Sequence, residues 1–198
     1  MKNLTTLTLA ARKRGISLIE AVLYLVIALA VIVGGIVFFQ QAQLSNQVTD
    51  TARAGVGISS QVRGLYQSQR DFSEEDLTAA IVASGSVPSN FIGADDSDGN
   101  PTIVHPFGGD MIVHGTNGEF AIAYTDLSLA ACLRLGTVGE DGAGPLGTGI
   151  MGHRIVRNWT EATVDLASGN RGTTPPIDAA YLAENCQENA SLVMYYSR

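Results

Sequence analysis

The sequence predicts an α+β protein in which a long N-terminal α-helix carries a globular head with an antiparallel β-sheet. The first observation is an apolar segment, Ile16 to Phe39, that continues without proline into polar sequence with helical spacing. The second is a set of short segments with strand character in the second half of the chain. The third is composition, because 22 glycines and 7% aromatic residues suit a loop-rich domain better than a close-packed enzyme core.

Charge is distributed unevenly along the chain. The first fifteen residues contain no acid and four basic residues, namely Lys2, Arg12, Lys13 and Arg14. Without them, 8 basic residues face all 19 acidic ones, and the side-chain net charge changes from −7 to −11. An acidic body of this kind repels nucleic acid, so no nucleic-acid partner is predicted. No lysine follows Gly15, which excludes Schiff-base chemistry and Ser–Lys dyads from that part of the chain.

The apolar segment is long enough to cross a membrane. As a helix, its length is roughly 36 Å. The basic residues before it predict a cytoplasmic N-terminus and an exported remainder. A secretory signal peptide would have a shorter apolar stretch. A plain membrane anchor explains the length but not Glu20, because a carboxylate in an apolar span costs about 2.5–3.5 kcal/mol at mid-membrane and usually marks function.

The residues around Gly15 resemble the processing site of type IV prepilins. The sequence reads RKRG followed by ISLIEA, so Glu20 becomes the fifth residue once a basic leader ending in Gly15 is removed. The resemblance implies cleavage between Gly15 and Ile16 by a prepilin peptidase, and N-methylation of Ile16. We expect Glu20 of an incoming subunit to pair with the amine of Ile16 of a docked subunit. Such a pair sets the register, because sliding would leave a buried charge unpaired.

One helix is predicted from residue 16 to about Arg70, since no proline occurs before Pro88. After the apolar part, hydrophobic residues recur at near-helical spacing, which predicts an amphipathic half. These residues are Leu44, Val48, Ala52, Ile58, Val62 and Leu65. Gly34 and Gly35 interrupt the apolar part, and either close helix–helix approach or a point of bending explains them.

The predicted organisation has three parts. Residues 1–15 are a leader, residues 16–70 are the long helix with 16–39 as its transmembrane or filament-core segment, and residues 71–198 are a disulfide-bonded head. Within the head the sequence predicts helices over 73–85, 127–135 and 176–185, and strands over 111–113, 119–125 and 191–197. The first of these helices is expected to begin at Ser73 as N-cap, with acids in its first turn.

Two loops superficially suggest ligand sites. Residues 94–101 (ADDSDGNP) suggest calcium binding, but Ala94 occupies the position of the first calcium ligand. Residues 136–149 are rich in glycine like phosphate loops, but lack the lysine of a P-loop. Both are therefore predicted to be solvated loops.

The only two cysteines are Cys132 and Cys186. Both lie well beyond the apolar segment, on the side that the positive-inside rule exports. A disulfide is predicted there, since exported cysteine pairs are usually oxidised. The alternative is a pair of buried free thiols.

The head resembles type IVb pilins through motifs in three places. A PFGG-like motif is matched by Pro106-Phe107-Gly108-Gly109. An AAC-bearing helix is matched by Ala130-Ala131-Cys132, and a late cysteine shortly before a terminal strand is matched by Cys186. The resemblance implies a structural pilus subunit, more specifically a major one. The expected partners are further copies of the chain, a prepilin peptidase, the inner-membrane assembly machinery and, before assembly, the membrane.

The expected location follows from the same resemblance. The precursor would lie in the inner membrane with its head in the periplasm, and the mature chain in an extracellular filament. That filament would serve adhesion, aggregation, conjugation or DNA uptake. A minor pilin, a type II secretion pseudopilin, and a membrane-anchored periplasmic enzyme or binding protein remain as alternatives.

No catalytic constellation is found. The three histidines, His105, His114 and His153, lack metal-ligand spacing, although a hairpin would bring His105 and His114 together. No enzyme activity, cofactor or metal is therefore predicted. Charged residues are instead expected to act in assembly, through contacts between arginines of one subunit and acids of its neighbour in the filament. The candidates are Arg53, Arg63 and Arg70, with acids at 74–76 and 95–98.

Overall fold

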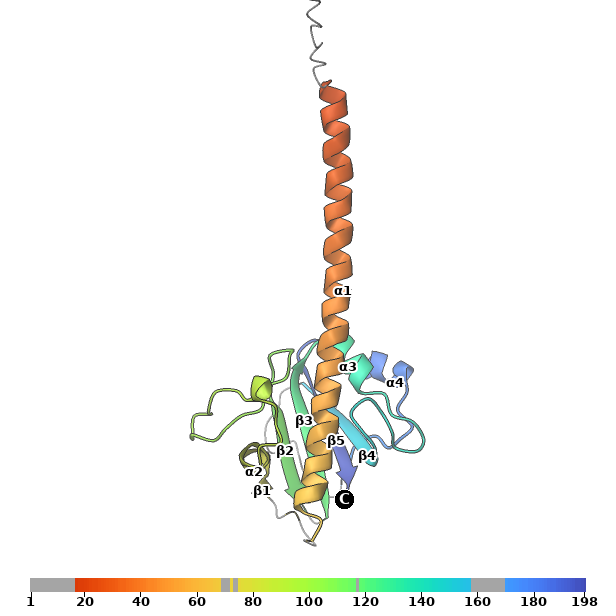
Figure 1. Ribbon diagram of the computed structural model, residues 1–198. Coiled ribbons are helices and arrows are strands. Elements are labelled where there is room, and N and C mark those ends of the chain that lie inside the picture. The colour runs from red at the N-terminus through yellow and green to blue at the C-terminus, as the bar shows by residue number, and fades with distance from the viewer. Residues whose placement is uncertain (1–16, 69–71, 73–74, 117, 158–169) are drawn as a thin grey trace, which may run out of the picture. The chain divides into compact units, whose positions relative to one another are not determined.

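The computed structural model describes residues 17–68, 72, 75–116, 118–157 and 170–198. The chain divides into two units, residues 1–42 and 43–198. Helix α1 (Leu18–Leu65) contributes to both units, and the elements after it follow in the order β1, α2, η1, β2, β3, α3, β4, α4 and β5 (Figure 1). The α+β class expected from the sequence is confirmed.

The first unit contains the apolar part of α1. Every residue from Ser17 to Ala42 is exposed, and Leu18 and Phe38 expose 83% and 74% of their surface. The helix continues unbroken through Gly34 and Gly35. Among the described residues, α1 is the one helix long and apolar enough to cross a membrane. Large apolar side chains exposed to this degree require lipid or another apolar surface around them.

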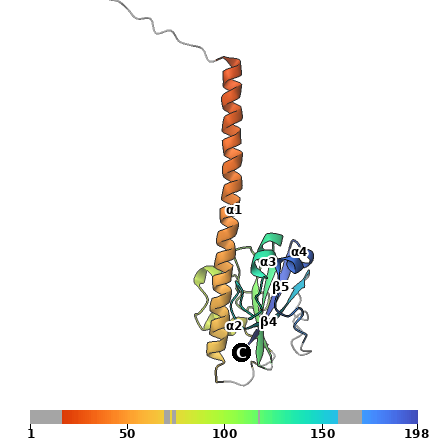
Figure 2. The ribbon, with the colours of Figure 1, turned by 90° about the vertical axis from the view of Figure 1, so that its right-hand side faces the viewer.

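The second part of α1 packs on the head. Its buried residues recur every three or four positions, at Thr51, Ala54, Gly55, Ile58, Ser59 and Val62. This spacing places them on one face of the helix, and the ribbon shows that this part of α1 lies against the sheet (Figure 2). The amphipathic half is therefore confirmed. The helix ends at Leu65, whereas the sequence predicted helix to about Arg70.

The head contains one five-stranded sheet. Its strands are β1 (Glu75–Asp76), β2 (Met111–Thr116), β3 (Glu119–Leu127), β4 (Ile150–Val156) and β5 (Ala190–Ser197). The spatial order is β1-β2-β3-β5-β4, and all neighbours are antiparallel. The last strand therefore lies inside the sheet, between β3 and β4, and pairs with both of them.

The strands predicted within 111–113, 119–125 and 191–197 are confirmed, but β4 was not predicted from the sequence. Its sequence, IMGHRIV, breaks the alternation of apolar and polar residues at Gly152, His153 and Arg154. The register with β5 also shifts between Ile150 and Gly152. An irregular strand of this kind forms because β5 supplies its hydrogen-bond partners, and local patterning does not reveal it.

Both faces of the sheet are buried in its centre. On β5, Leu192, Met194 and Tyr196 belong to the main core together with residues of α1. Val193 and Tyr195 point to the opposite face, where they pack with Ala121 and Ala123 of β3. The burial of both faces explains why these strands are apolar without clear alternation.

The short helices are α2 (Thr78–Ala83), the 3-10 turn η1 (Ser89–Phe91), α3 (Leu129–Leu135) and α4 (Ala179–Asn185). Ser128 caps α3 by accepting a hydrogen bond from the backbone of Ala131, and Asp178 caps α4 by accepting one from Tyr181. The helices expected over 127–135 and 176–185 are therefore present, each with a polar N-cap.

The helix expected over 73–85 is shorter than predicted. Glu75 and Asp76, assigned from the sequence to its first turn, form β1 at the edge of the sheet instead. The Asp76 carboxylate still accepts a hydrogen bond from the amide of Thr78 (2.8 Å), at the start of α2. The prediction for these acids was wrong because pairing with β2 prevailed over local capping preference. Ser73, the expected N-cap, lies outside the described residues.

Candidate functional site

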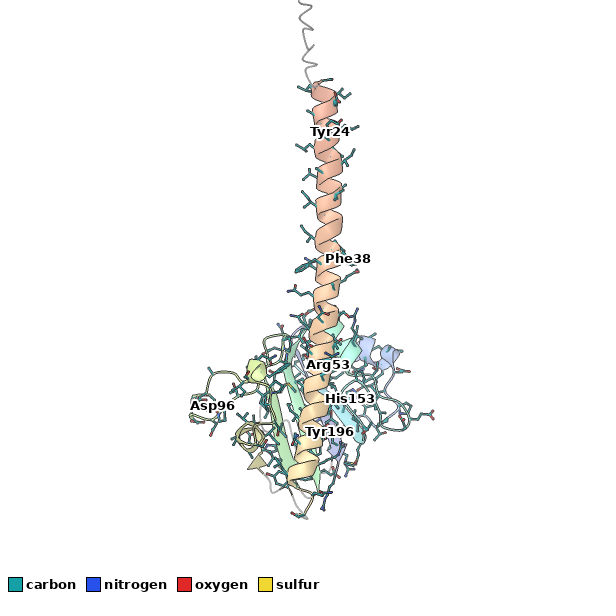
Figure 3. All side chains as sticks on the ribbon, in the orientation of Figure 1. Tyr24, Phe38, Arg53, Asp96, His153 and Tyr196 are labelled. Atoms are coloured by element: carbon teal, nitrogen blue, oxygen red, sulfur yellow. A yellow bond between two sulfur atoms is a disulfide. The ribbon has the colours of Figure 1, made fainter. Side chains whose placement is uncertain are left out.

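Glu20 lies in the first turn of α1, surrounded by apolar residues. It is exposed, and the Tyr24 hydroxyl donates a hydrogen bond of 3.4 Å to its Oε1. Figure 3 shows Tyr24 projecting from this part of the helix. A bond of that length is weak, so the carboxylate retains most of its capacity to bind a cation from another molecule. The predicted cleavage site, Gly15–Ile16, lies outside the described residues.

The PFGG motif forms a tight turn between the loop before it and β2. The amide of Gly108 donates to the carbonyl of His105 (2.8 Å), and the amide of His105 donates to the carbonyl of Gly109 (2.9 Å). Gly108 has φ of 93°, a conformation that favours glycine. A Cβ at Gly109 would overlap the backbone carbonyl of Thr125 on β3. The two glycines thus meet two different needs, a left-handed turn and a close approach of two backbones.

The same turn also contacts α1. The side-chain amide of Gln47 donates a hydrogen bond to the carbonyl of Pro106 (3.0 Å). The turn therefore lies between β3 and the packed part of α1. We conclude that the PFGG motif has a structural role, since it contacts α1 and β3, two elements that are distant in sequence.

His105 fixes this turn from inside. Its Nε2 donates to the carbonyl of Thr125 (2.8 Å), and its Nδ1 accepts from the amide of Phe107 (3.3 Å). These two bonds require the neutral ring, and burial lowers the pKa of His105. His105 is therefore unsuited to bind a metal ion, because both of its ring nitrogens already take part in hydrogen bonds.

His153 is a buried residue whose position the sequence did not indicate. It is fully buried on β4, where its ring and the Tyr181 ring form a T-shaped pair with centroids 5.4 Å apart. Its backbone exchanges two hydrogen bonds of 2.9 Å with Thr173. Burial lowers the pKa of His153 to about 4. The flanking Ile150 and Ile155 were the available signal that this glycine-containing segment is a strand.

The predicted disulfide is confirmed. Cys132 on α3 is bonded to Cys186, the residue that ends α4, and their Cα atoms are 6.0 Å apart. Both cysteines are buried. The bond joins α3 to the segment that leads into β5, so it ties the last strand to the middle of the chain.

Arg63 has a role within the molecule that differs from the one suggested by the sequence. Its guanidinium donates to the carbonyl oxygens of Ser197 (3.2 Å) and Thr148 (2.8 Å). It also lies over the rings of Phe120 and Tyr196, at 5.5 and 5.8 Å from their centroids. Arg63 thus anchors the end of α1 to the sheet. Its Nε and one terminal nitrogen donate within the head, and the suggestion that it meets acids of a neighbouring subunit stays a prediction.

The loop over 94–101 is held by its own hydrogen bonds. The Asp96 carboxylate accepts from the amides of Asp98 (2.9 Å) and Asn100 (2.8 Å) and from the Asn100 side chain (3.2 Å). The Asn100 backbone hydrogen bond is the largest cause that lowers the pKa of Asp96. Within the part of the chain that the structure describes, no group of three or more His, Cys, Asp or Glu residues is arranged to hold a metal ion.

Comparisons with known proteins agree with this architecture. A family model described as PilS N terminal matches residues 45–195. The chain is 29% identical over 192 residues to the "Major structural subunit of bundle-forming pilus" of Escherichia coli O127:H6 (strain E2348/69 / EPEC), covering 94% of this chain and 95% of that one. It is 31% identical over 147 residues to the protein of the same name from Escherichia coli O111:H-, covering 72% and 70%.

A solved structure shares the fold. The crystal structure of the type IV b pilin from Salmonella typhi superimposes with a TM-score of 0.51 over 80% of this chain and 99% of that one, at 18% identity. The apolar helix, the antiparallel head and its disulfide define a type IVb pilin. The chain belongs to the PilS N-terminal family, and its function is that of a structural pilus subunit.

Proposed function

We propose that this chain is the precursor of a major pilin, cut between Gly15 and Ile16 and polymerised into an extracellular filament through its N-terminal helix. The single observation that carries this proposal is Glu20, an exposed carboxylate in the first turn of an otherwise apolar helix. The two curated relatives, both named as major structural subunits, support the assignment to a major rather than a minor pilin.

The exposed apolar residues of α1 support a chain that lies in the membrane first and in a filament afterwards. Their side chains need lipid before assembly and other apolar helices after it. Within either environment an unpaired carboxylate is costly, so Glu20 favours any arrangement that supplies a cation. Cleavage after Gly15 creates such a cation at the amine of Ile16. Because each copy has one acid and one amine, only a fixed stagger between copies pairs every charge.

The partners and the location follow from this scheme. A prepilin peptidase at the cytoplasmic membrane face would remove residues 1–15, and the inner-membrane assembly machinery would extract the mature chain. The basic leader and the apolar helix support an inner-membrane precursor with a cytoplasmic N-terminus and a periplasmic head. The structural role of the PFGG turn and of His105 supports a chain that acts by assembly rather than by catalysis.

The decisive experiment compares three substitutions of Glu20 in cells that express the full chain. We expect Glu20→Ala and Glu20→Gln to reduce sheared surface filaments by about tenfold or more, since neither supplies the charge. Glu20→Asp keeps the charge and should retain substantially more filament. Membrane fractionation and mass spectrometry of the N-terminus provide the controls for insertion and cleavage. Normal filament yield from Glu20→Ala would exclude the pairing mechanism.

Cleavage is tested separately. A bulky residue at Gly15 should leave the leader attached and abolish filaments, while membrane insertion continues. Mass spectrometry of the N-terminus of wild-type filaments should give a chain that begins with methylated Ile16. A filament subunit that retains residues 1–15 would contradict the proposed processing.

A further inference from the structure

An apolar groove lies beside an exposed arginine on the packed part of α1. The groove, which we call the Arg53 groove, has a volume of about 430 Å³ and is lined by Val48, Thr49, Ala52, Arg53, Val56 and Pro145. Val56 is 44% exposed although its neighbours on the opposite side of the helix are buried. An apolar concavity with one cation at its rim suits a partner that offers both carboxylates and apolar surface.

Arg53 is available for such a partner. Its side chain is 79% exposed, and its ionic contact is with Asp50 on the same helix, at 3.9 Å. An exposed pair of this geometry contributes less than about 1 kcal/mol. This sets Arg53 apart from Arg63 and Arg171, whose guanidinium groups bind Ser197 and Glu119 within the head.

The complementary surface is the acid loop, residues 94–98. Asp96 uses its carboxylate to hold the loop in shape, which fixes the backbone before any partner arrives. Within the described ranges, the side chains of Asp95 and Asp98 take part in no hydrogen bond or ion pair of their own. Ile92 at the base of the loop is 43% exposed and adds apolar surface. Figure 3 shows Asp96 on a loop that protrudes from the head, away from Arg53.

We propose that the Arg53 groove binds the acid loop of a second copy of this chain, with Asp95 and Asp98 paired to Arg53. The proposal rests on the assembly into filaments proposed above and names one contact between heads within it. Charge complementarity selects this occupant. The chain after Gly15 contains 19 acidic and 8 basic residues, so most approaches between heads are repulsive, and an exposed arginine beside an apolar groove is an attractive point.

The positions of the two surfaces fit an open polymer. In the ribbon, the acid loop extends on one side of α1, and the loop that contains Pro145 lies on the other side (Figure 1). A contact between two different patches is heterologous, so each copy keeps one free groove and one free loop after it has docked. Contacts of this type produce helical filaments when the rotation does not close a ring.

Charge reversal in the full chain tests the contact. We expect Arg53→Glu, and separately the double substitution Asp95→Arg with Asp98→Arg, to lower the yield of sheared filaments by about tenfold, because each places like charges together. Combining all three should restore the yield to within about threefold of wild type. Arg134→Glu is the matched control, since Arg134 is also exposed, and it should assemble normally. Formation of the Cys132–Cys186 disulfide shows that each head has folded.

Disulfide trapping tests the geometry. Arg53→Cys with Asp98→Cys should give ladders of cross-linked subunits on non-reducing gels of filaments. Gln61→Cys with Asp98→Cys uses an exposed position two turns further along α1 and should give none. The contact is overturned if the charge reversals assemble normally, if the triple variant fails to recover, or if both cysteine pairs cross-link equally. Filaments that form regardless would leave assembly through Glu20 intact, whereas a wild type without filaments would overturn the proposed function itself.

Discussion

The two halves of α1 show how one helix can be adapted to two environments. From Leu18 to Ala42 all residues are exposed and most are apolar. From Gln43 to Leu65 polar residues are frequent, and one face is buried against the sheet. The first half therefore depends on lipid or on other copies, and the second on its own head.

The glycines of α1 differ in the space beside them. At Gly34 and Gly35 an added Cβ would meet nothing within 4 Å, whereas at Gly55 it would overlap the Tyr124 hydroxyl of β3. The glycines in the first half are open to a neighbour, and Gly55 in the second half is already filled by one.

The largest expected effect comes from separating the halves. Residues 43–198 contain the whole core cluster, so we expect them to fold without residues 1–42 when exported to an oxidising compartment. This fragment should be soluble and monomeric, while the mature chain requires membrane or detergent. Fractionation and size-exclusion chromatography measure both. A fragment that aggregates unfolded would show that the head needs the apolar half.

The next largest effect is removal of the disulfide. Replacing both Cys132 and Cys186 by serine should lower the free energy of unfolding of the head by about 4 kcal/mol, because the bond closes a long loop in the unfolded chain. Denaturant unfolding of the 43–198 fragment measures this loss. Insertion of the first half of α1 into membranes should not change, and loss of insertion would contradict the independence of the halves.

A smaller effect is expected from acid. The pKa of His153 is lowered to about 4 in the folded head, against 6.5 in the unfolded chain. Its contribution is thus fully present above about pH 6.5 and is lost as the pH falls towards 4, since the unfolded chain then binds the proton more readily. The total loss is on the order of 3 kcal/mol.

The matched variant for this prediction is His153→Phe, which keeps an aromatic ring against Tyr181. The free energy of unfolding of the variant should fall less steeply than that of the wild type between pH 6.5 and 4. His105 also has a lowered pKa, so some dependence on pH should remain in the variant. Equal slopes in the two proteins would exclude His153 as a contributor.

The smallest effects distinguish the glycines. Gly55→Ala should destabilise the head by about 1–3 kcal/mol through overlap with Tyr124. Gly57→Ala, where an added Cβ meets nothing within 4 Å, should instead stabilise it by up to about 1 kcal/mol. Adding Tyr124→Phe to Gly55→Ala should recover part of the loss. Thermal unfolding of the fragment measures all three, and equal effects at Gly55 and Gly57 would contradict the close approach.

By itself, the sequence determined the features that depend on local pattern and on membrane physics. The apolar segment, Glu20 within it and the continuation into an amphipathic helix all follow from residues that lie close together in the sequence. The disulfide was predicted from two cysteines on the side of the apolar segment that is expected to be exported. Three of the strands also follow, because their apolar and β-branched residues are contiguous.

The tertiary structure alone decided the features that depend on distant partners. β4 forms because β5 pairs with an irregular segment. The two acids of β1 pair with β2 and do not form the first turn of a helix that the sequence had predicted. Arg63 is bound to the last strand, and Gly109 is required by a carbonyl of β3. In each case the stabilising group lies far along the chain. Local preference is worth about 1 kcal/mol or less per residue, so tertiary pairing overrides it.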